Sequence, residues 1–336
     1  MLNIHKKIKE FTGCTVDNIP SEVICSTEPL VLRGLVDSWP MVEVARGTVQ
    51  QTLEYLSQFS TDEPLTVFRG RAEIGGRVFY NEDFSGFNFD TDQLSMAVVA
   101  SHILNNIDQP QAPMFYVGST MIDKWFPGFR SKNDLSLQEY DPLVSIWMGN
   151  QSRIPAHYDF ADNIACCVAG RRRFILFPPD QLSNLYVGPL DFTPAGQPIS
   201  LVDFANPDFE QFPRFEEALK YAQVVELEPG DAIRIPSMWW HHVEALDSFN
   251  VLVNYWWRNS PSFMGGPLNV LQHAMLGLRD LPPEQRAVWQ DLFKYYVFEP
   301  NQENFAHIPE RARGVLNSLT EDAAKQIRAL LINRLK

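Results

Sequence analysis

A His-x-Asp tripeptide near the middle of the chain restricts the possible folds more than any other feature. His157 and Asp159 lie two residues apart, just before a β-prone stretch at 164–177. In an extended segment, side chains at i and i+2 point to the same face, so the imidazole and the carboxylate would lie side by side. Together they supply two of the three ligands of a two-His, one-carboxylate site, which typically binds non-haem Fe(II). The fold must then bring another histidine to the same point from a different strand.

The adjacent histidines His241 and His242 are the candidates for this third ligand. They follow the turn Glu228-Pro-Gly-Asp231 and a short β-prone run at 232–235, which places them near the end of a strand. Neighbouring residues of an extended segment point to opposite faces, so only one of the two can point toward the metal. The other would point away and bond to a carboxylate of its own parity, such as Glu244.

Short β-prone segments bounded by Gly and Pro dominate the first three quarters of the chain. Strands are predicted at 65–68, 77–80, 114–117, 143–148, 164–169, 172–177, 224–227, 232–235 and 250–257. Many short strands of this kind favour a sandwich or barrel of the jelly-roll and cupin type. In such a barrel, inward-facing residues from distant strands line one cavity, so residues far apart in the sequence can share one ion.

Helical patterns flank the strands and take over at the C-terminal end. Helices are predicted at 3–11, 49–58, 92–106, 214–222, 267–280, 283–298, 308–317 and 321–335. We therefore expect a mainly-β domain over residues 1–262, with N-terminal helical decoration, and a helical region over residues 263–336.

Composition narrows the classes of partner and compartment. The chain has 41 acidic and 28 basic residues, for a net charge of −13, which disfavours nucleic acid as the main partner. The four cysteines lack zinc-type spacing and are expected to be reduced thiols. The N-terminal residues lack the apolar stretch of a secretion signal, and no run approaches the ~18 apolar residues of a membrane span. We expect a cytoplasmic protein with no membrane partner.

The stretch 155–257 resembles the JmjC-type, cupin-like 2-oxoglutarate oxygenases, and among them most closely the asparaginyl hydroxylase type that modifies hypoxia-inducible factor. The similar residues include Pro155-Ala-His-Tyr-Asp159, Asn163, Gly170, Ile175-Leu-Phe-Pro-Pro-Asp-Gln181, Pro229-Gly-Asp231, Trp239-Trp-His-His-Val-Glu244 and Val253-Asn-Tyr-Trp256. Weaker similarity extends to Pro29-Leu-Val-Leu-Arg-Gly34 and to Tyr116. The resemblance implies a double-stranded β-helix. It also implies hydroxylation of a C–H bond coupled to the oxidative decarboxylation of 2-oxoglutarate to succinate.

The resemblance also implies roles for individual residues. By position, the Fe(II) ligands would be His157, Asp159 and His241, so the first histidine of the pair is selected. The residues around the metal and the co-substrate 2-oxoglutarate would be Tyr116, Asn163, Arg172, Asn254 and Trp256, with Tyr116 and Arg172 at its distal carboxylate. This chain departs from the pattern twice. The family commonly has Lys where Arg172 stands, and the hydroxylase has Thr where Ile154 stands.

Simpler interpretations compete with these roles. Arg172 would be an ordinary solvated strand residue, as Arg171 and Arg173 are expected to be, and Asn163 and Asn254 would be turn or core amides. At the level of function, two alternatives stand beside a 2-oxoglutarate oxygenase. One is a non-catalytic cupin-like binding module, and the other is a cupin metalloenzyme that uses no 2-oxoglutarate.

The sequence leaves the substrate open and predicts a homodimer. The substrate is a polypeptide or a small molecule, because one fold and one co-substrate serve many substrates. Apolar stripes run along the predicted helices of residues 263–336, and the resemblance implies dimerisation there. The alternative is that these stripes pack on the barrel.

Overall fold

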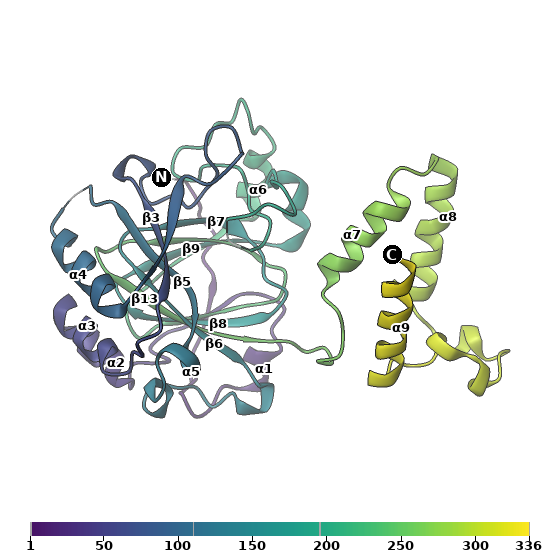
Figure 1. Cartoon of the computed structure of the whole chain (residues 1–336), viewed down its shortest axis with the longest axis horizontal. Helices are drawn as coiled ribbons and strands as arrows, with labels where there is room; N and C mark the ends of the chain where they lie inside the picture. The colour runs from purple at the N-terminus through teal and green to yellow at the C-terminus, as the bar shows by residue number, and fades with distance from the viewer. Residues whose placement is uncertain (1, 110, 195, 336) are drawn as a thin grey trace. The chain divides into compact units, whose positions relative to one another are not determined.

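The computed structural model describes residues 2–109, 111–194 and 196–335, and these form two compact units, Met1–Asn259 and Ser260–Lys336 (Figure 1). The first unit is built on two β-sheets and the second is helical. Among the described residues, no helix is long and apolar enough to cross a membrane.

The larger sheet of the first unit has the strand order β1-β2-β11-β8-β13-β6-β5-β3-β4. Its strands are β1 (Lys9–Phe11), β2 (Leu30–Leu32), β3 (Leu65–Gly70), β4 (Phe89–Leu94), β5 (Met114–Met121), β6 (Leu143–Gly149), β8 (Asp162–Ala169), β11 (Ala232–Ile235) and β13 (Asn250–Trp257). The smaller sheet has the order β10-β9-β12-β7. Its strands are β7 (Arg153–His157), β9 (Arg172–Phe177), β10 (Gln223–Leu227) and β12 (Trp240–Ala245). From β6 onward the chain repeatedly crosses between the sheets, and this is the predicted double-stranded β-helix.

Side-chain alternation along the central strands separates three apolar layers. In β8, Cys166 packs in the core beneath the flanking helices, whereas Cys167 packs between the two sheets. In β9, Leu176 lies between the sheets and Phe177 packs on the outer side of the smaller sheet. Every residue of β8 is buried because both faces of its sheet are covered, which is why the sequence there is almost continuously apolar.

Helices cover one side of the larger sheet, where α2, α3 and α4 lie together (Figure 1). The helices of the first unit are α1 (Ser21–Ile24), α2 (Pro40–Ala45), α3 (Val49–Ser57), α4 (Met96–Asn106), α5 (Ile122–Trp125) and α6 (Phe215–Tyr221). The helical unit contains α7 (Pro267–Leu278), α8 (Pro283–Phe293) and α9 (Glu321–Arg334). The predicted start of the helix at 49–58 is confirmed, because Thr48 and Gln51 form a capping box.

Three predicted elements are wrong, and a physical reason is visible for the first and the last of them. Residues 3–11 form no helix, since Lys9–Phe11 pairs in parallel with Leu30–Leu32 and an isolated helix of this length is marginal. Residues 77–80 make only isolated bridges and form no strand. The predicted helix at 308–317 is two 3₁₀ turns, because Gly314, the first residue of the second turn, adopts a left-handed conformation with φ 55°.

Candidate metal and co-substrate site

Neighbouring strands of the smaller sheet bring the His-x-Asp motif and the histidine pair together. His157 ends β7, and in the antiparallel pairing of β7 with β12 it lies directly opposite His241. The two imidazole centroids are 4.3 Å apart, and His241 Nε2 lies 3.6 Å from Asp159 Oδ2. One ligand atom from each of the three residues lies within 4.8 Å of the other two. The two imidazoles and the carboxylate could therefore hold one metal ion on one face of the site.

Backbone carbonyls orient both imidazoles for this task. His157 Nδ1 lies 2.9 Å from the carbonyl oxygen of Pro155, and His241 Nδ1 lies 3.0 Å from that of Trp239. When each Nδ1–H donates to its carbonyl, each Nε2 keeps a free lone pair for a metal. Burial, with a smaller effect of His157, lowers the pKa of His241 to about 4, so the ring is neutral at pH 7. The neutral imidazole is the form that binds metal.

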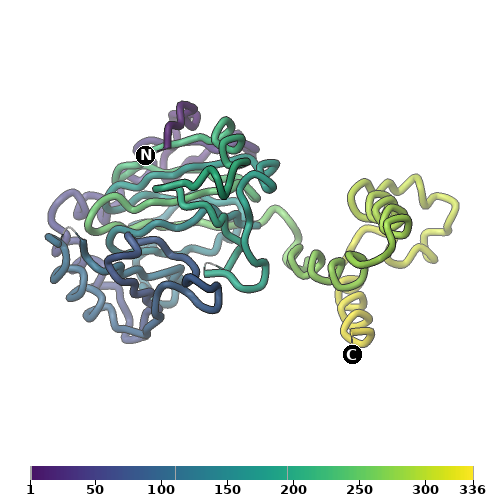
Figure 2. Tube along the Cα trace, turned by 90° about the horizontal axis from the view of Figure 1, so that it is seen from above, coloured from purple at the N-terminus to yellow at the C-terminus, as the bar shows by residue number. Residues whose placement is uncertain are grey.

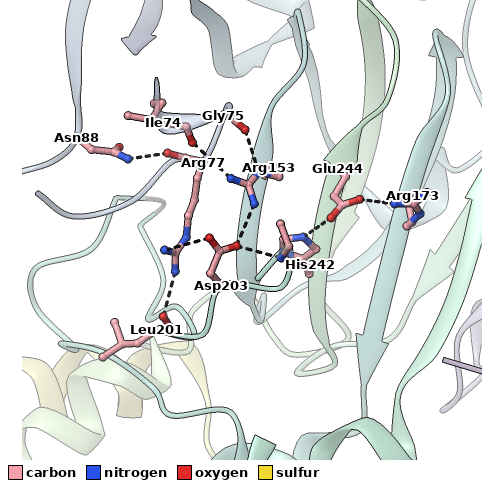
Figure 3. A network of polar contacts seen from close by, with 11 residues as sticks. Ile74, Gly75, Arg77, Asn88, Arg153, Arg173, Leu201, Asp203, His242 and Glu244 are labelled. Atoms are coloured by element: carbon pink, nitrogen blue, oxygen red, sulfur yellow. Dashed lines mark hydrogen bonds and ion pairs between the residues drawn. The ribbon is translucent and has the colours of Figure 1, made fainter. Parts of the chain in front are cut away.

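His242 points to the opposite side of the strand, as side-chain alternation predicts. Its Nε2 lies 3.2 Å from Glu244 Oε1, the expected carboxylate of the same parity, and its ring packs on Phe204 at 4.5 Å. Arg173 holds the other oxygen of Glu244 at 2.8 Å. Figure 3 shows this group continuing to Asp203, which accepts a hydrogen bond of 2.9 Å from Arg153. The second histidine therefore belongs to a polar network behind the metal site.

A cavity of about 500 Å³ opens beside the three candidate ligands. All the site residues predicted from the sequence line it, namely Tyr116, His157, Asp159, Asn163, Arg172, His241, Asn254 and Trp256. Both sheets contribute, with β9 and β12 on one side and β5, β6 and β13 on the other. Ile154 also lines the cavity and contributes an apolar surface there.

Arg172 is a buried cation for which the described residues supply no anionic partner. The residue is only 2% exposed. Within the described part of the chain it forms no ion pair, and its Nε has no hydrogen-bond partner. Burial lowers the pKa of Arg172. By contrast, Arg171 pairs with Asp247 and Arg173 with Glu226 and Glu244. The interpretation of Arg172 as a solvated residue is wrong, and a buried guanidinium facing a cavity is a site for an anion.

Further polar atoms on the cavity wall lack partners among the described residues. Asn254 Nδ2 donates to Asn163 Oδ1 at 3.0 Å, but Asn254 Oδ1 is left without a donor. The indole nitrogens of Trp147 and Trp256 are likewise unpaired. Burial raises the pKa of Tyr116, so its hydroxyl stays protonated and can donate a hydrogen bond. Buried polar groups are normally paired, so these atoms fit a polar ligand.

Sequence reasoning missed several lining residues. Trp147 on β6, Phe68 on β3 and Gln197 in the long connection before β10 all reach the cavity. Alternation along β6 could have identified Trp147, since it has the same parity as Ser145 and Gly149 and the opposite parity to the core residues Ile146 and Met148. No local pattern marked Gln197, because it lies outside regular structure.

The chain is similar to a protein family and to several known proteins. A family model described as a cupin-like domain matches residues 17–263. The tRNA wybutosine-synthesizing protein 5 of Gallus gallus is 25% identical over 307 residues, covering 83% of this chain and 91% of that protein. A lysine-specific demethylase of Arabidopsis thaliana, JMJ31, is 36% identical over 118 residues, covering 35% of this chain and 21% of that protein.

A third relative shares a similar stretch. The human HSPB1-associated protein 1 is 34% identical over 114 residues, which is 33% of this chain and 23% of that protein. The matching region thus spans less than a quarter of the demethylase and of the HSPB1-associated protein, but nearly the whole of the wybutosine-synthesizing protein.

Proposed function

Because this chain belongs to the cupin-like domain family and is of the JmjC type, we propose that it is an Fe(II)- and 2-oxoglutarate-dependent oxygenase that hydroxylates its substrate. One observation carries the proposal. Two imidazoles and a carboxylate converge on the wall of a cavity that also contains a buried guanidinium with no acidic partner among the described residues. A metal ion and a dianion would satisfy both features at once.

The donor set suits Fe(II). His157, Asp159 and His241 would hold the metal through two neutral nitrogens and one carboxylate oxygen, and these ligands would leave coordination positions free on the cavity side. When bound, Fe(II) and 2-oxoglutarate would use O₂ as the oxidant, with one oxygen atom going into succinate as 2-oxoglutarate loses carbon dioxide and the other into a hydroxylated substrate C–H bond. The task of the two carbonyls behind the imidazoles is to keep each Nε2 aimed at one point.

The polar atoms deeper in the cavity suit 2-oxoglutarate. Arg172 would bind the distal carboxylate through its guanidinium, and the Tyr116 hydroxyl would donate a further hydrogen bond. A planar guanidinium can bind both oxygens of a carboxylate, which compensates for the hydroxyl that Ile154 lacks. Asn254 Nδ2 donates to Asn163, and its free Oδ1 is an acceptor that would need a donor other than 2-oxoglutarate, such as water.

Similarity to the relatives supports a reaction type for this chain, but it does not identify the substrate. The names of the relatives refer to a lysine demethylase in one case and to tRNA modification in another, so their substrates differ. The similarity of residues 155–257 to the asparaginyl hydroxylase type favours hydroxylation as the outcome. The net charge of −13 argues against an RNA substrate.

Two measurements on the purified chain test the proposal. Anaerobic calorimetry should detect binding of 2-oxoglutarate that requires Fe(II), and addition of oxygen and ascorbate should release succinate slowly without any substrate. The control is the double variant His157→Ala, Asp159→Ala, which should do neither. If metal binds but 2-oxoglutarate does not, the chain is instead a cupin metalloenzyme of another kind.

A further inference from the structure

A ladder of aromatic rings leads from the cavity wall to the protein surface. It begins at Phe68, which lines the cavity and lies 4.7 Å from Phe89. Phe89 stacks on Phe87 at 5.2 Å, and Phe87 stacks on Phe192 at 4.8 Å. The outer end is exposed, because Phe192 is 36% and Phe84 is 43% accessible. Exposed aromatic rings that continue a cavity wall are typical of a binding surface.

Two segments far apart in the sequence form this surface, which we call the rim and define as residues 79–90 and 188–194. They lie side by side, one blue and one teal in Figure 2, and the Tyr80 hydroxyl donates to the Phe192 carbonyl at 2.6 Å. Phe84 stacks on Tyr80 at 4.8 Å although its backbone has φ 59°. A bulky residue is uncommon in this left-handed conformation, so the loop holds an exposed ring in place at a cost in backbone energy.

The residues of the rim itself carry charge of one sign only, and the Arg77 guanidinium lies beside them, 3.5 Å from the centroid of the Phe79 ring. The rim contains Glu82, Asp83, Asp90 and Asp191 but no Lys or Arg, and all four acids are exposed. Within the described residues, none of the four belongs to an ion pair, whereas the nearby Arg69 and Arg77 pair with Asp92 and Asp203. Aromatic faces and unpaired carboxylates both attract cations, so this surface complements a basic ligand.

The rim also adjoins a free sheet edge. Strand β4 is the last strand of the larger sheet and pairs only with β3 among the described strands. Phe89, Thr91 and Gln93 share one face of β4, and Gln93 donates to the cavity residue Thr66. An edge strand offers backbone groups to an extended peptide, which a small cation cannot use.

We propose that the rim and the β4 edge dock an extended, basic polypeptide segment, one side chain of which enters the cavity. The proposal rests on the proposed oxygenase function for its chemistry, because the docked segment would be the substrate. Aromatic rings would contact the aliphatic stems and cationic heads of Lys or Arg, and the four acids would steer the segment to the cavity mouth.

Fluorescence anisotropy with three labelled dodecapeptide pools tests the docking. Every second position is Lys, Gln or Glu, and the remaining positions are random. Binding is measured anaerobically on the full chain, with and without Fe(II) and 2-oxoglutarate. We expect the Lys pool to bind at least about 10-fold more tightly than the Gln pool, with a difference that shrinks as salt is added. Equal binding of the Gln or Glu pool would overturn the proposal.

Charge-reversal variants locate the site. The variant Glu82→Lys, Asp83→Lys, Asp90→Lys, Asp191→Lys should lose the preference for the Lys pool. A matched control, Glu43→Lys, Glu54→Lys, Asp62→Lys, Glu63→Lys, changes the net charge equally at exposed positions outside the rim and should keep it. If both variants lose the preference for the Lys pool equally, the preference depends on net charge alone, and the rim is not the docking site. Should the reversed rim not fold, Glu82→Gln with Asp191→Asn removes charge without adding any.

Two further comparisons separate this docking from other ligands and from the oxygenase activity. Two sets of Lys-pool peptides carry backbone N-methyl groups, one set on the Lys residues and the other on the residues between them. The two sets should bind with different affinity, because only every second N–H of an extended peptide faces the edge strand. Spermidine that displaces the Lys pool at equal charge would overturn a polypeptide ligand. Succinate release without substrate is measured separately, so failure of docking and failure of the oxygenase function give different results.

Discussion

Arg234 and Asp162 form a buried ion pair, with Arg234 Nη2 2.6 Å from Asp162 Oδ1, that joins β11 to the first residue of β8. The same carboxylate accepts a hydrogen bond of 3.1 Å from the Ser237 N–H. One residue further on, the Met238 N–H donates to the Asp159 carbonyl at 2.8 Å. These contacts tie the backbone that carries Asp159 to the backbone that leads into His241.

Removing the cation from this pair should weaken both the fold and the metal site. In Arg234→Met, Asp162 keeps its contacts to Ser237 and Asn259 but loses its buried counter-charge, so we expect the free energy of unfolding to fall by about 3 kcal/mol. Metal affinity should fall about 10-fold, a loss typical of mutating residues that orient the ligands of a metal without binding it. Urea denaturation and metal titration measure the two effects. The exposed Arg258→Met is the control, and equal losses in both variants would contradict this role.

The two adjacent histidines should behave differently when each is replaced. His241→Ala removes a metal ligand and should lower Fe(II) affinity by at least about 100-fold, more than the 10- to 100-fold typical of outer groups. His242→Ala should keep the metal and lose some stability, because it leaves Glu244 without one partner. Anaerobic equilibrium dialysis measures binding, and circular dichroism checks each fold. A folded His242→Ala protein that binds no iron would disprove the assignment.

Replacing Arg172 should affect the co-substrate and not the metal. A hydrogen bond to a charged group contributes about 2 to 3 kcal/mol, so Arg172→Leu should weaken 2-oxoglutarate binding about 30- to 150-fold. Stability should stay the same or rise, since the unpaired guanidinium is costly to bury. Arg171→Leu is the matched control, because that arginine is exposed and paired with Asp247. Unchanged calorimetric affinity in Arg172→Leu would remove Arg172 from the co-substrate site.

The buried thiols should make the protein less stable in alkali. Burial raises the pKa of Cys167 to about 12 and that of Cys166 well above its ordinary value. Above pH 9 the unfolded chain loses these protons while the folded chain keeps them, so stability falls as pH rises. Each thiol should contribute a loss of about 1 to 1.5 kcal/mol between pH 8 and pH 10.

Denaturant titrations at several pH values measure this slope. The variant Cys166→Ala, Cys167→Ala should have a shallower slope than the wild type. Replacement of the exposed Cys25 by Ala should leave the slope unchanged. An identical pH dependence in all three proteins would show that the buried thiols do not titrate as their surroundings imply.

We propose that the chain forms a homodimer through its helical unit. The residues of this unit leave many apolar side chains uncovered, including Val270 at 56% and Val288 at 58% exposure. Light scattering at micromolar concentration should give twice the 38.5 kDa of one chain. Val270→Asp with Val288→Asp should give a monomer, whereas Val315→Asp, an exposed change in a 3₁₀ turn, should not. A monomeric wild type would contradict the proposal.

The sequence by itself determined the features that depend on local chemistry and periodicity. The β-prone runs predicted between residues 143 and 177 and between 224 and 257 are strands in the structure. Their alternating or continuous apolar residues can be buried on one or both faces of a sheet when the backbone is extended. Parity alone required His241 and His242 to separate, and the structure places them on opposite sides of β12. The sequence could also indicate Arg172, but only through the resemblance of its position to that of a family residue.

Only the tertiary structure decided what those residues face. Register between β7 and β12 places His157 opposite His241, and register depends on pairing across 84 positions of chain that no local pattern encodes. Whether Arg172 is solvated or buried depends on what both sheets bring around it, and among the described residues no acid pairs with it, whereas its neighbours Arg171 and Arg173 pair with acids. The rim also depends on the tertiary structure, since Phe87 and Phe192 stack although their segments lie far apart in the sequence. Local propensity decides which backbone conformation forms, whereas burial and long-range pairing decide which side chains meet.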